Sequence, residues 1–166
     1  MQWTDKGIIL SCKKYGERSF IIRCLTEEHG IHAGLVRINK KQSGLYQTGN
    51  LLEITWKARL EEHLGSMQCE VLKPVAAGLM HDPVRLSALN AVCTILDKSL
   101  LERQNHYDIY INLLSFLSSL IENENWEQNY VSFEMSLLTS LGYGLELDEC
   151  ADTGSKDNLV YVSPKS

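Results

Sequence analysis

The sequence predicts an α+β chain, with a small β barrel in its first half and a bundle of α-helices in its second. Three observations predict this class. Short runs rich in β-branched and aromatic residues recur as far as Leu72, with turn residues between them. Beyond Pro74 the apolar period changes from two to the roughly 3.6 residues of a helix. The chain has 166 residues, of which 44% are hydrophobic, enough for one domain or two small ones with a core.

Five runs in the first half have the pattern of strands. They cover residues 7–14, 19–26, 31–38, 51–59 and 66–72. The first three are separated by short turns, which predicts a meander. In the fourth run one face is apolar and is expected to be core, and it carries Leu52, Ile54, Trp56 and Ala58. Closing five short antiparallel strands into a barrel would remove the exposed edges.

Three helices are expected in the second half, over residues 83–100, 107–123 and 127–141. Asp82 and Pro83 form a good N-cap and first-turn pair for the first helix. The apolar stripes that should pack together are Leu86, Leu89, Val92, Cys93 and Leu96; Tyr110, Leu113, Leu114, Leu117, Leu120 and Ile121; and Tyr130, Phe133, Leu137, Leu138 and Leu141. A short late strand is predicted at 159–162, and a domain boundary between residues 1–77 and 78–166.

Charge divides unequally between these halves. Residues 1–77 carry a net charge of +3 and residues 78–166 a net charge of −8, which together give the chain its −5. Such a split is typical of a module that faces a polyanion joined to one that does not, although ordinary surface variation can also produce it.

Several chemical functions find no support in the sequence. There is no GxxxxGK[ST] loop and no serine in a GxSxG setting, and residues 61–63 (Glu-Glu-His) fit a solvated hairpin tip better than a catalytic pair. His29 and His32 lack further ligands at metal spacing, and the five cysteines contain no CxxC pair, so we expect reduced thiols and no metal or other cofactor. No apolar run is long enough for a membrane span or a signal peptide, which predicts a cytoplasmic protein. Because none of these catalytic patterns is found, we also expect that the protein is not an enzyme.

Basic and aromatic residues do occur together in the first half, which suits single-stranded nucleic acid. Cations would follow the phosphates, and flat rings would stack on bases. In barrels of the OB type, the loops joining strands 1–2 and 4–5 frame the binding surface. The candidate DNA-binding residues are Lys13, Lys14, Tyr15, Arg18, Arg37, Lys40, Lys41, Lys57 and Arg59. The alternative stays open that these side chains are merely solvated and that the barrel serves to dock proteins.

An ordered set of short segments resembles the bacterial RecO family of recombination mediators. The segments are WTDKGIIL (3–10), YGE (15–17), LTEEHG (25–30), GLVR (34–37), QTGNL (47–51), WKARLEEHLG (56–65), LGY (141–143) and SPKS (163–166). The resemblance implies an N-terminal five-stranded OB-fold followed by a helical bundle domain. It further implies a role in DNA repair and recombination after DNA damage, through binding of single- and double-stranded DNA, strand annealing and work with RecR, in the cytoplasm at the nucleoid.

The resemblance also implies docking of the acidic C-terminal tail of the single-stranded-DNA-binding protein on the helical half. Arg85 and Arg103 are the expected anchors, because arginine can grip a carboxylate with two hydrogen bonds. Two departures from the family pattern matter. Some relatives hold a four-cysteine zinc site, whereas Cys150 stands alone, and family chains run beyond Ser166, so the helical domain is expected to be incomplete.

Overall fold

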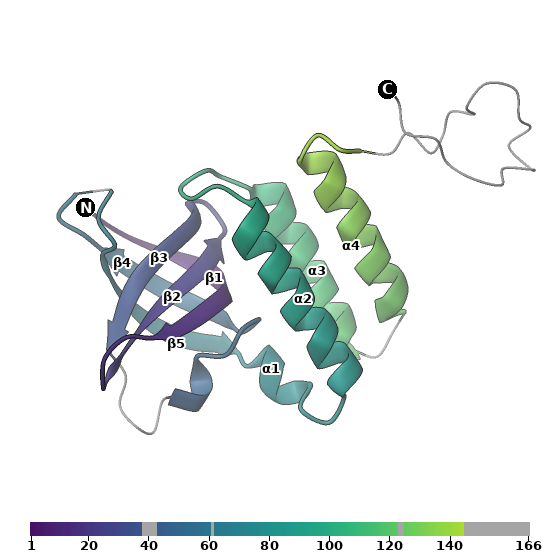
Figure 1. Ribbon diagram of the computed structural model, residues 1–166, viewed down its shortest axis with the longest axis horizontal. Coiled ribbons are helices and arrows are strands. Elements are labelled where there is room, and N and C mark those ends of the chain that lie inside the picture. Colours follow the sequence, from purple (N-terminus) through teal and green to yellow (C-terminus); the bar gives the residue numbers. More distant parts are fainter. Residues whose placement is uncertain (38–42, 61, 123–124, 145–166) are drawn as a thin grey trace, which may run out of the picture.

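The computed structural model describes residues 1–37, 43–60, 62–122 and 125–144, and shows a β barrel packed against helices (Figure 1). Five strands close in the order β1-β2-β3-β5-β4, which confirms the predicted α+β class with its small barrel. The strands are β1 (Gln2–Lys14), β2 (Ser19–Thr26), β3 (Gly30–Arg37), β4 (Leu51–Lys57) and β5 (Ser66–Lys73). The helices are the 3-10 turn η1 (Ser43–Leu45), α1 (Val75–Gly78), α2 (Pro83–Ser99), α3 (Tyr107–Glu122) and α4 (Trp126–Ser140).

The first strand is longer than predicted, because it begins at Gln2 and not at residue 7. Its first half pairs with β4 and its second half with β2, so it belongs to both sides of the barrel. The register shifts between Ile9 and Ser11, and this bulge gives the strand the bend that closure requires. Sequence periodicity missed the first half because 2–6 contain a single apolar residue, Trp3, which pairs with Trp56.

The barrel interior is one apolar cluster, and Trp56 is its largest member. This side chain is 1% exposed, and its indole N–H donates to the carbonyls of Ala33 and Leu64 at 3.1 and 3.2 Å. Leu52 and Ile54 are buried beside it, which confirms the predicted inner face of β4. A polar indole nitrogen is tolerated there only because its hydrogen bonds are satisfied.

A second apolar cluster joins the barrel to the helices. The cluster contains four strand residues that pack outside the barrel against the buried residues of α2, α3 and α4. They are Ile8, Leu10, Leu25 and Ile31. The predicted domain boundary after residue 77 falls inside α1 and stays a prediction. The second apolar cluster contains residues from both sides of this boundary. The barrel and the helices therefore share buried apolar surface.

The predicted helices are present, and most of their apolar stripes are confirmed. Asp82 caps α2 as expected, since its Oδ1 accepts from the backbone N–H groups of Val84 and Arg85, both at 3.1 Å. The prediction that Ile121 and Leu138 belong to the buried stripes was wrong, because these side chains are 36% and 39% exposed. Phe116 was missed and lies in the core. The short helix α1 was not predicted, and the predicted strand at 159–162 lies outside the described residues.

The loop between α2 and α3 is fastened to the start of β3. Glu102 forms a parallel bridge with Ile31, and the backbone N–H of Arg103 donates to the Ile31 carbonyl at 2.9 Å. Gly30 adopts a φ of +70°, and a Cβ there would lie 1.8 Å from the carbonyl oxygen of Gln104. Only glycine permits this approach of two backbones.

Candidate nucleic-acid interface

The predicted basic residues at the end of β1, in the β1–β2 turn and at the end of β3 meet at one end of the barrel. Lys13 and Lys14 are the last residues of β1, and a turn closed by the Tyr15 N–H on the Ser19 carbonyl, at 2.8 Å, carries Arg18. Ser19 pairs with Arg37 across β2 and β3, so the end of β3 lies beside this turn. The ring of Tyr15 is 59% exposed, as a stacking platform for a base requires.

The seam between β3 and β5 brings Lys57 to the same region. Lys57 pairs with Ser66 on β5, and Ser66 pairs with Leu35 on β3. Two strand spacings of about 4.8 Å thus separate Lys57 from Leu35, which lies two residues before Arg37. Arg59, predicted on the polar face of this strand, lies in the bend beyond its end and is exposed.

A groove of about 560 Å³ follows this seam. β3 and β5 run parallel, which corrects the prediction that all five strands are antiparallel, and their ladder has a single pair of partners, Leu35 and Ser66. Arg37 lies at the edge of the groove, and the polar side chain of Gln68 and the half-buried thiol of Cys69 line it. Tyr46 also lines the groove, which sequence reasoning missed, although a lone aromatic residue in a polar loop was a usable signal.

The described candidate cations, of which Arg37 lines this groove, share one property, which is that they make no ion pair with any described residue. They are Lys13, Lys14, Arg18, Arg37, Lys57 and Arg59, and all are exposed. Lys40 and Lys41 lie outside the described residues. Cations that keep their charge exposed and uncompensated are available to phosphates.

Arg23, in contrast, is a barrel cation that is already occupied. Its Nε donates to Oδ1 of Asp97 at 2.6 Å, and Nη1 pairs with Glu102. Burial acts to lower the pKa of Arg23, but the hydrogen bonds and charges of these two carboxylates outweigh it and raise the pKa. Arg23 therefore fastens β2 to the end of α2 and is not part of the open basic set.

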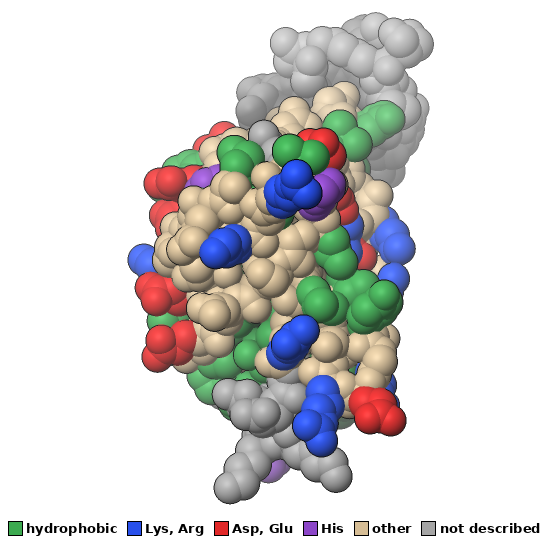
Figure 2. Space-filling view, turned by 90° about the vertical axis from the view of Figure 1, so that its left-hand side faces the viewer, with side chains coloured by type: hydrophobic (Ala, Val, Ile, Leu, Met, Phe, Trp, Pro, Cys, Tyr) green, Lys and Arg blue, Asp and Glu red, His purple; other side chains and the backbone are tan. Residues whose placement is uncertain are grey.

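The basic side chains do not form a continuous patch on the barrel side. Figure 2 shows Lys and Arg side chains that stand singly, separated by uncharged surface, with acidic side chains along one edge. The arrangement can neutralise phosphates at several separate points of a strand. It offers little of the focused field that a dense basic stripe would produce.

The helical half contains an apolar groove between α2 and α4, with a volume of about 400 Å³. Val84 and Ala88 line it from α2, and Trp126 and Tyr130 from α4. The Arg85 guanidinium lies 5.8 Å from the centroid of the Trp126 ring, so a predicted anchor does border an apolar pocket between helices. Part of the hydrogen-bonding capacity of Arg85 is already used. Its Nη1 donates to the Leu120 carbonyl at 2.7 Å, and its Nε lies 3.1 Å from Oδ2 of Asp82.

Arg103, the second predicted anchor, lies elsewhere. It follows the C-terminal end of α2, whereas Arg85 is in its first turn, so the length of α2, about 24 Å, separates them. Arg103 has a φ of +62°, and its backbone N–H donates to the Ile31 carbonyl. The backbone of Arg103 therefore connects the α2–α3 loop to the barrel. The two arginines therefore cannot line one pocket.

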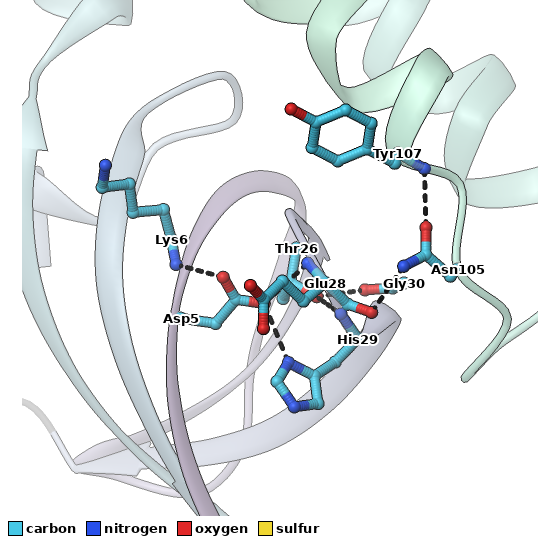
Figure 3. A network of polar contacts seen from close by, with 8 residues as sticks. All are labelled: Asp5, Lys6, Thr26, Glu28, His29, Gly30, Asn105 and Tyr107. Atoms are coloured by element: carbon cyan, nitrogen blue, oxygen red, sulfur yellow. Dashed lines mark hydrogen bonds and ion pairs between the residues drawn. The ribbon is translucent and has the colours of Figure 1, made fainter.

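The two histidines considered as metal ligands belong to an aromatic stack. The His29 ring lies parallel to Trp3 with centroids 4.2 Å apart, and His32 meets Trp3 and Trp56 edge-on. Asp5 holds the turn, because its carboxylate accepts from His29 Nδ1 and from the backbone N–H of Glu28, each at 2.9 Å (Figure 3). Burial lowers the pKa of His32, and the charge of His29 lowers it further.

Among the described residues no three histidine, cysteine or acidic side chains gather as metal ligands. Cys150 lies outside that part of the chain, so the absence of zinc stays a prediction, checked by metal analysis of the purified protein. Burial raises the pKa of Cys69 and Cys93 to about 12, which keeps both as unreactive thiols. In the same ranges no helix has the length and apolarity to cross a bilayer.

Comparison with known proteins agrees with this architecture. The family model "Recombination protein O N terminal" matches residues 1–75, and "Recombination protein O C terminal" matches residues 80–166. The DNA repair protein RecO of Roseobacter denitrificans is 43% identical over 168 residues, which cover all of this chain and 70% of that protein. RecO proteins of a Ruegeria species and of Rhodospirillum rubrum are 42% and 41% identical, again over the whole chain and over 70% and 69% of their own lengths. The chain belongs to the RecO family of DNA repair proteins, which are recombination mediators.

Proposed function

We propose that this chain binds single- and double-stranded DNA on its barrel, anneals complementary strands, and acts with RecR to load recombinase on single-stranded DNA, without catalysing a reaction. The observation that carries the proposal is the set of exposed cations without described ion-pair partners at one end of the barrel, with exposed Tyr15 among them and Arg37 in the β3–β5 groove. Phosphate contacts position a strand and bases stack without sequence readout, which suits a mediator that must act on any sequence.

Equilibrium titration of a labelled single-stranded oligonucleotide, at two or more salt concentrations, tests DNA binding. We expect affinity to fall steeply with salt, with a log–log slope of about −0.7 for each phosphate contact. The same titration with duplex DNA checks the second ligand. Binding that is absent at low salt would contradict the proposal.

A second candidate function is a protein-docking adaptor that does not bind nucleic acid. The apolar groove between α2 and α4 favours it, and so does the separation of the basic side chains on the barrel side (Figure 2). The two functions are compatible within one molecule. The salt titration distinguishes them, because a protein that is only an adaptor would not bind DNA at any salt concentration.

We place the acidic tail of the single-stranded-DNA-binding protein in the groove between α2 and α4. An aromatic side chain buried there would contribute about 1.5–3 kcal/mol, and Arg85 at the rim would receive a carboxylate. The net charge of −8 on residues 78–166 opposes an acidic tail, so we expect weak affinity.

Calorimetry with a tail peptide tests this docking. Arg85→Ala should weaken binding severalfold, whereas Arg103→Ala, about 24 Å away along α2, serves as the matched control and should leave binding unchanged. Strong binding that ignores both substitutions would place the tail on another surface, such as the basic end of the barrel.

A further inference from the structure

A third cavity lies where the barrel, α1 and the start of α2 meet. It shares only Tyr46 with the groove along the β3–β5 seam and no lining residue with the groove between α2 and α4. Its volume is about 390 Å³, within the range of small-molecule sites. We propose that this pocket receives one unstacked base of single-stranded nucleic acid whose phosphates lie on Lys13 and Lys14. The inference rests on the proposed DNA binding and adds a separate site for a base.

The walls of this base pocket have the two kinds of surface that a base requires. Phe20 and Tyr46 supply aromatic surface, and the thiol of Cys12 lies between apolar neighbours. Gln47, Thr48 and Asn90 supply amide and hydroxyl groups. These three side chains form no hydrogen bond with any described residue, so they are available to the polar edge of a base.

The pocket is held in shape by groups that do not face a ligand. The Asn50 amide, 1% exposed, donates to the Leu45 carbonyl at 2.8 Å and accepts from the Ala76 N–H at 3.0 Å, which ties the residues before β4 to α1. The Gly49 N–H donates to the Ile9 carbonyl at 2.8 Å. A Cβ on Gly49 would meet Leu89 of α2 at 2.5 Å, so this segment lies directly on the helix. A preformed site avoids part of the entropic cost of binding.

The register of β1 places cations next to the pocket. Cys12 is followed directly by Lys13 and Lys14, and Lys14 pairs with Phe20, which is another lining residue. Both lysines are exposed and make no ion pair with any described residue. A base can enter only when it is neither paired nor stacked, so the pocket favours single strands over duplex.

Thiol labelling of the full chain tests the pocket directly. Iodoacetamide modification is followed residue by residue by mass spectrometry, with and without saturating oligothymidylate longer than the roughly 16 nucleotides that one OB fold covers. Cys12 is half-buried and lines the pocket, so its labelling rate with and without DNA reports on occupation of the pocket. We expect the labelling of Cys12 to slow severalfold when DNA is bound.

The possible outcomes separate this inference from the proposed function. DNA binding with an unchanged labelling rate at Cys12 would overturn the pocket and leave DNA binding intact. Absence of any oligonucleotide binding would contradict the proposed function itself, and the pocket with it.

A double variant, Gln47→Ala with Asn90→Ala, checks that a base and not a phosphate occupies the pocket. We expect it to weaken oligothymidylate about tenfold, which corresponds to about 1.4 kcal/mol, and to leave an abasic oligonucleotide of the same length unaffected. Gln128→Ala, an amide deletion at an exposed position of α4, is the matched control. Equal weakening of both probes, or of neither, would overturn the assignment, as would protection of Cys12 by an aromatic peptide but not by DNA.

Discussion

The two ends of β2 differ in how their polar groups are used. At the β2–β3 turn, Asp5 accepts three hydrogen bonds, Asn105 donates to the Glu28 carbonyl, and Gly30 lies against the α2–α3 loop (Figure 3). At the β1–β2 turn, Tyr15 and Arg18 are exposed and Arg18 makes no ion pair with any described residue. The polar groups of the first end are paired within the protein, whereas those of the second are exposed, and we propose that the second end contacts DNA.

This difference indicates which substitutions should change the free energy of unfolding and which should change the affinity for DNA. A group whose partners are all within the protein contributes to the free energy of unfolding when those partners are buried. An exposed cation without a partner contributes little to stability and keeps its charge for phosphates. Equivalent substitutions at the two ends should therefore have opposite consequences.

The largest expected effect is that of Gly30→Ala. The variant combines an unfavourable φ of +70° with a Cβ placed 1.8 Å from the Gln104 carbonyl oxygen, so we expect the free energy of unfolding to fall by roughly 3–5 kcal/mol. Gly16→Ala is the matched control, because Gly16 has a φ of +74° with nothing within 4 Å of its Cβ, and it should cost roughly 1–2 kcal/mol. Urea denaturation measures both, and equal losses would show that the fastened joint does not stabilise the fold.

The next effect compares two arginines of the barrel. Arg23→Met leaves Asp97 without its partner, and since the Asp97 side chain is only 8% exposed, we expect a loss of about 1.5–3 kcal/mol of stability with unchanged DNA affinity. Arg37→Met should change stability by less than about 0.5 kcal/mol and should weaken DNA binding. Denaturation and DNA titration of both variants provide the check, and weaker DNA binding by Arg23→Met alone would reverse the assignment.

A smaller effect concerns pH. Burial lowers the pKa of His32 and of His106 below the unfolded value of about 6.5, so the unfolded chain takes up these protons first as pH falls. The contribution of the neutral histidines to the free energy of unfolding is fully present above about pH 6.5. It is lost as the pH falls through and below that value. We expect unfolding at pH 5.5 to require less urea than at pH 7.5, with part of the difference absent in His32→Phe. A difference of the same size in that variant would contradict this assignment.

Much of the fold could be predicted from the sequence, because periods of two and 3.6 residues mark the barrel strands and the helices. The first half of β1 could not, since Gln2 to Lys6 lack alternation and pair through backbone hydrogen bonds with β4. The single contact that closes β3 on β5 also leaves no pattern in the sequence.

The candidate sites were less predictable, for a physical reason. Arg23 and Arg37 both stand among apolar strand residues, and only contacts across 74 and 79 residues, to Asp97 and Glu102, distinguish them. The base pocket draws on segments that lie far apart in the sequence, among them those of Cys12, Gln47 and Asn90, and none of these three carries a motif by itself. Sequence reasoning identified the exposed cations that we propose contact DNA, but it could not find the cavity between the elements.

The salt dependence of single-stranded DNA binding by paired charge variants tests the central claim most directly. Arg18→Gln with Arg37→Gln removes two unpaired cations from the open end of the barrel, and Lys73→Gln with Lys98→Gln removes two exposed lysines elsewhere. We expect the first double variant to weaken binding and to make the log–log salt slope shallower by about 1.4, which is the loss of two phosphate contacts, while the second matches the unmodified chain. An unchanged affinity and slope in the first variant, or equal losses in both, would contradict binding of the phosphate backbone at this end of the barrel.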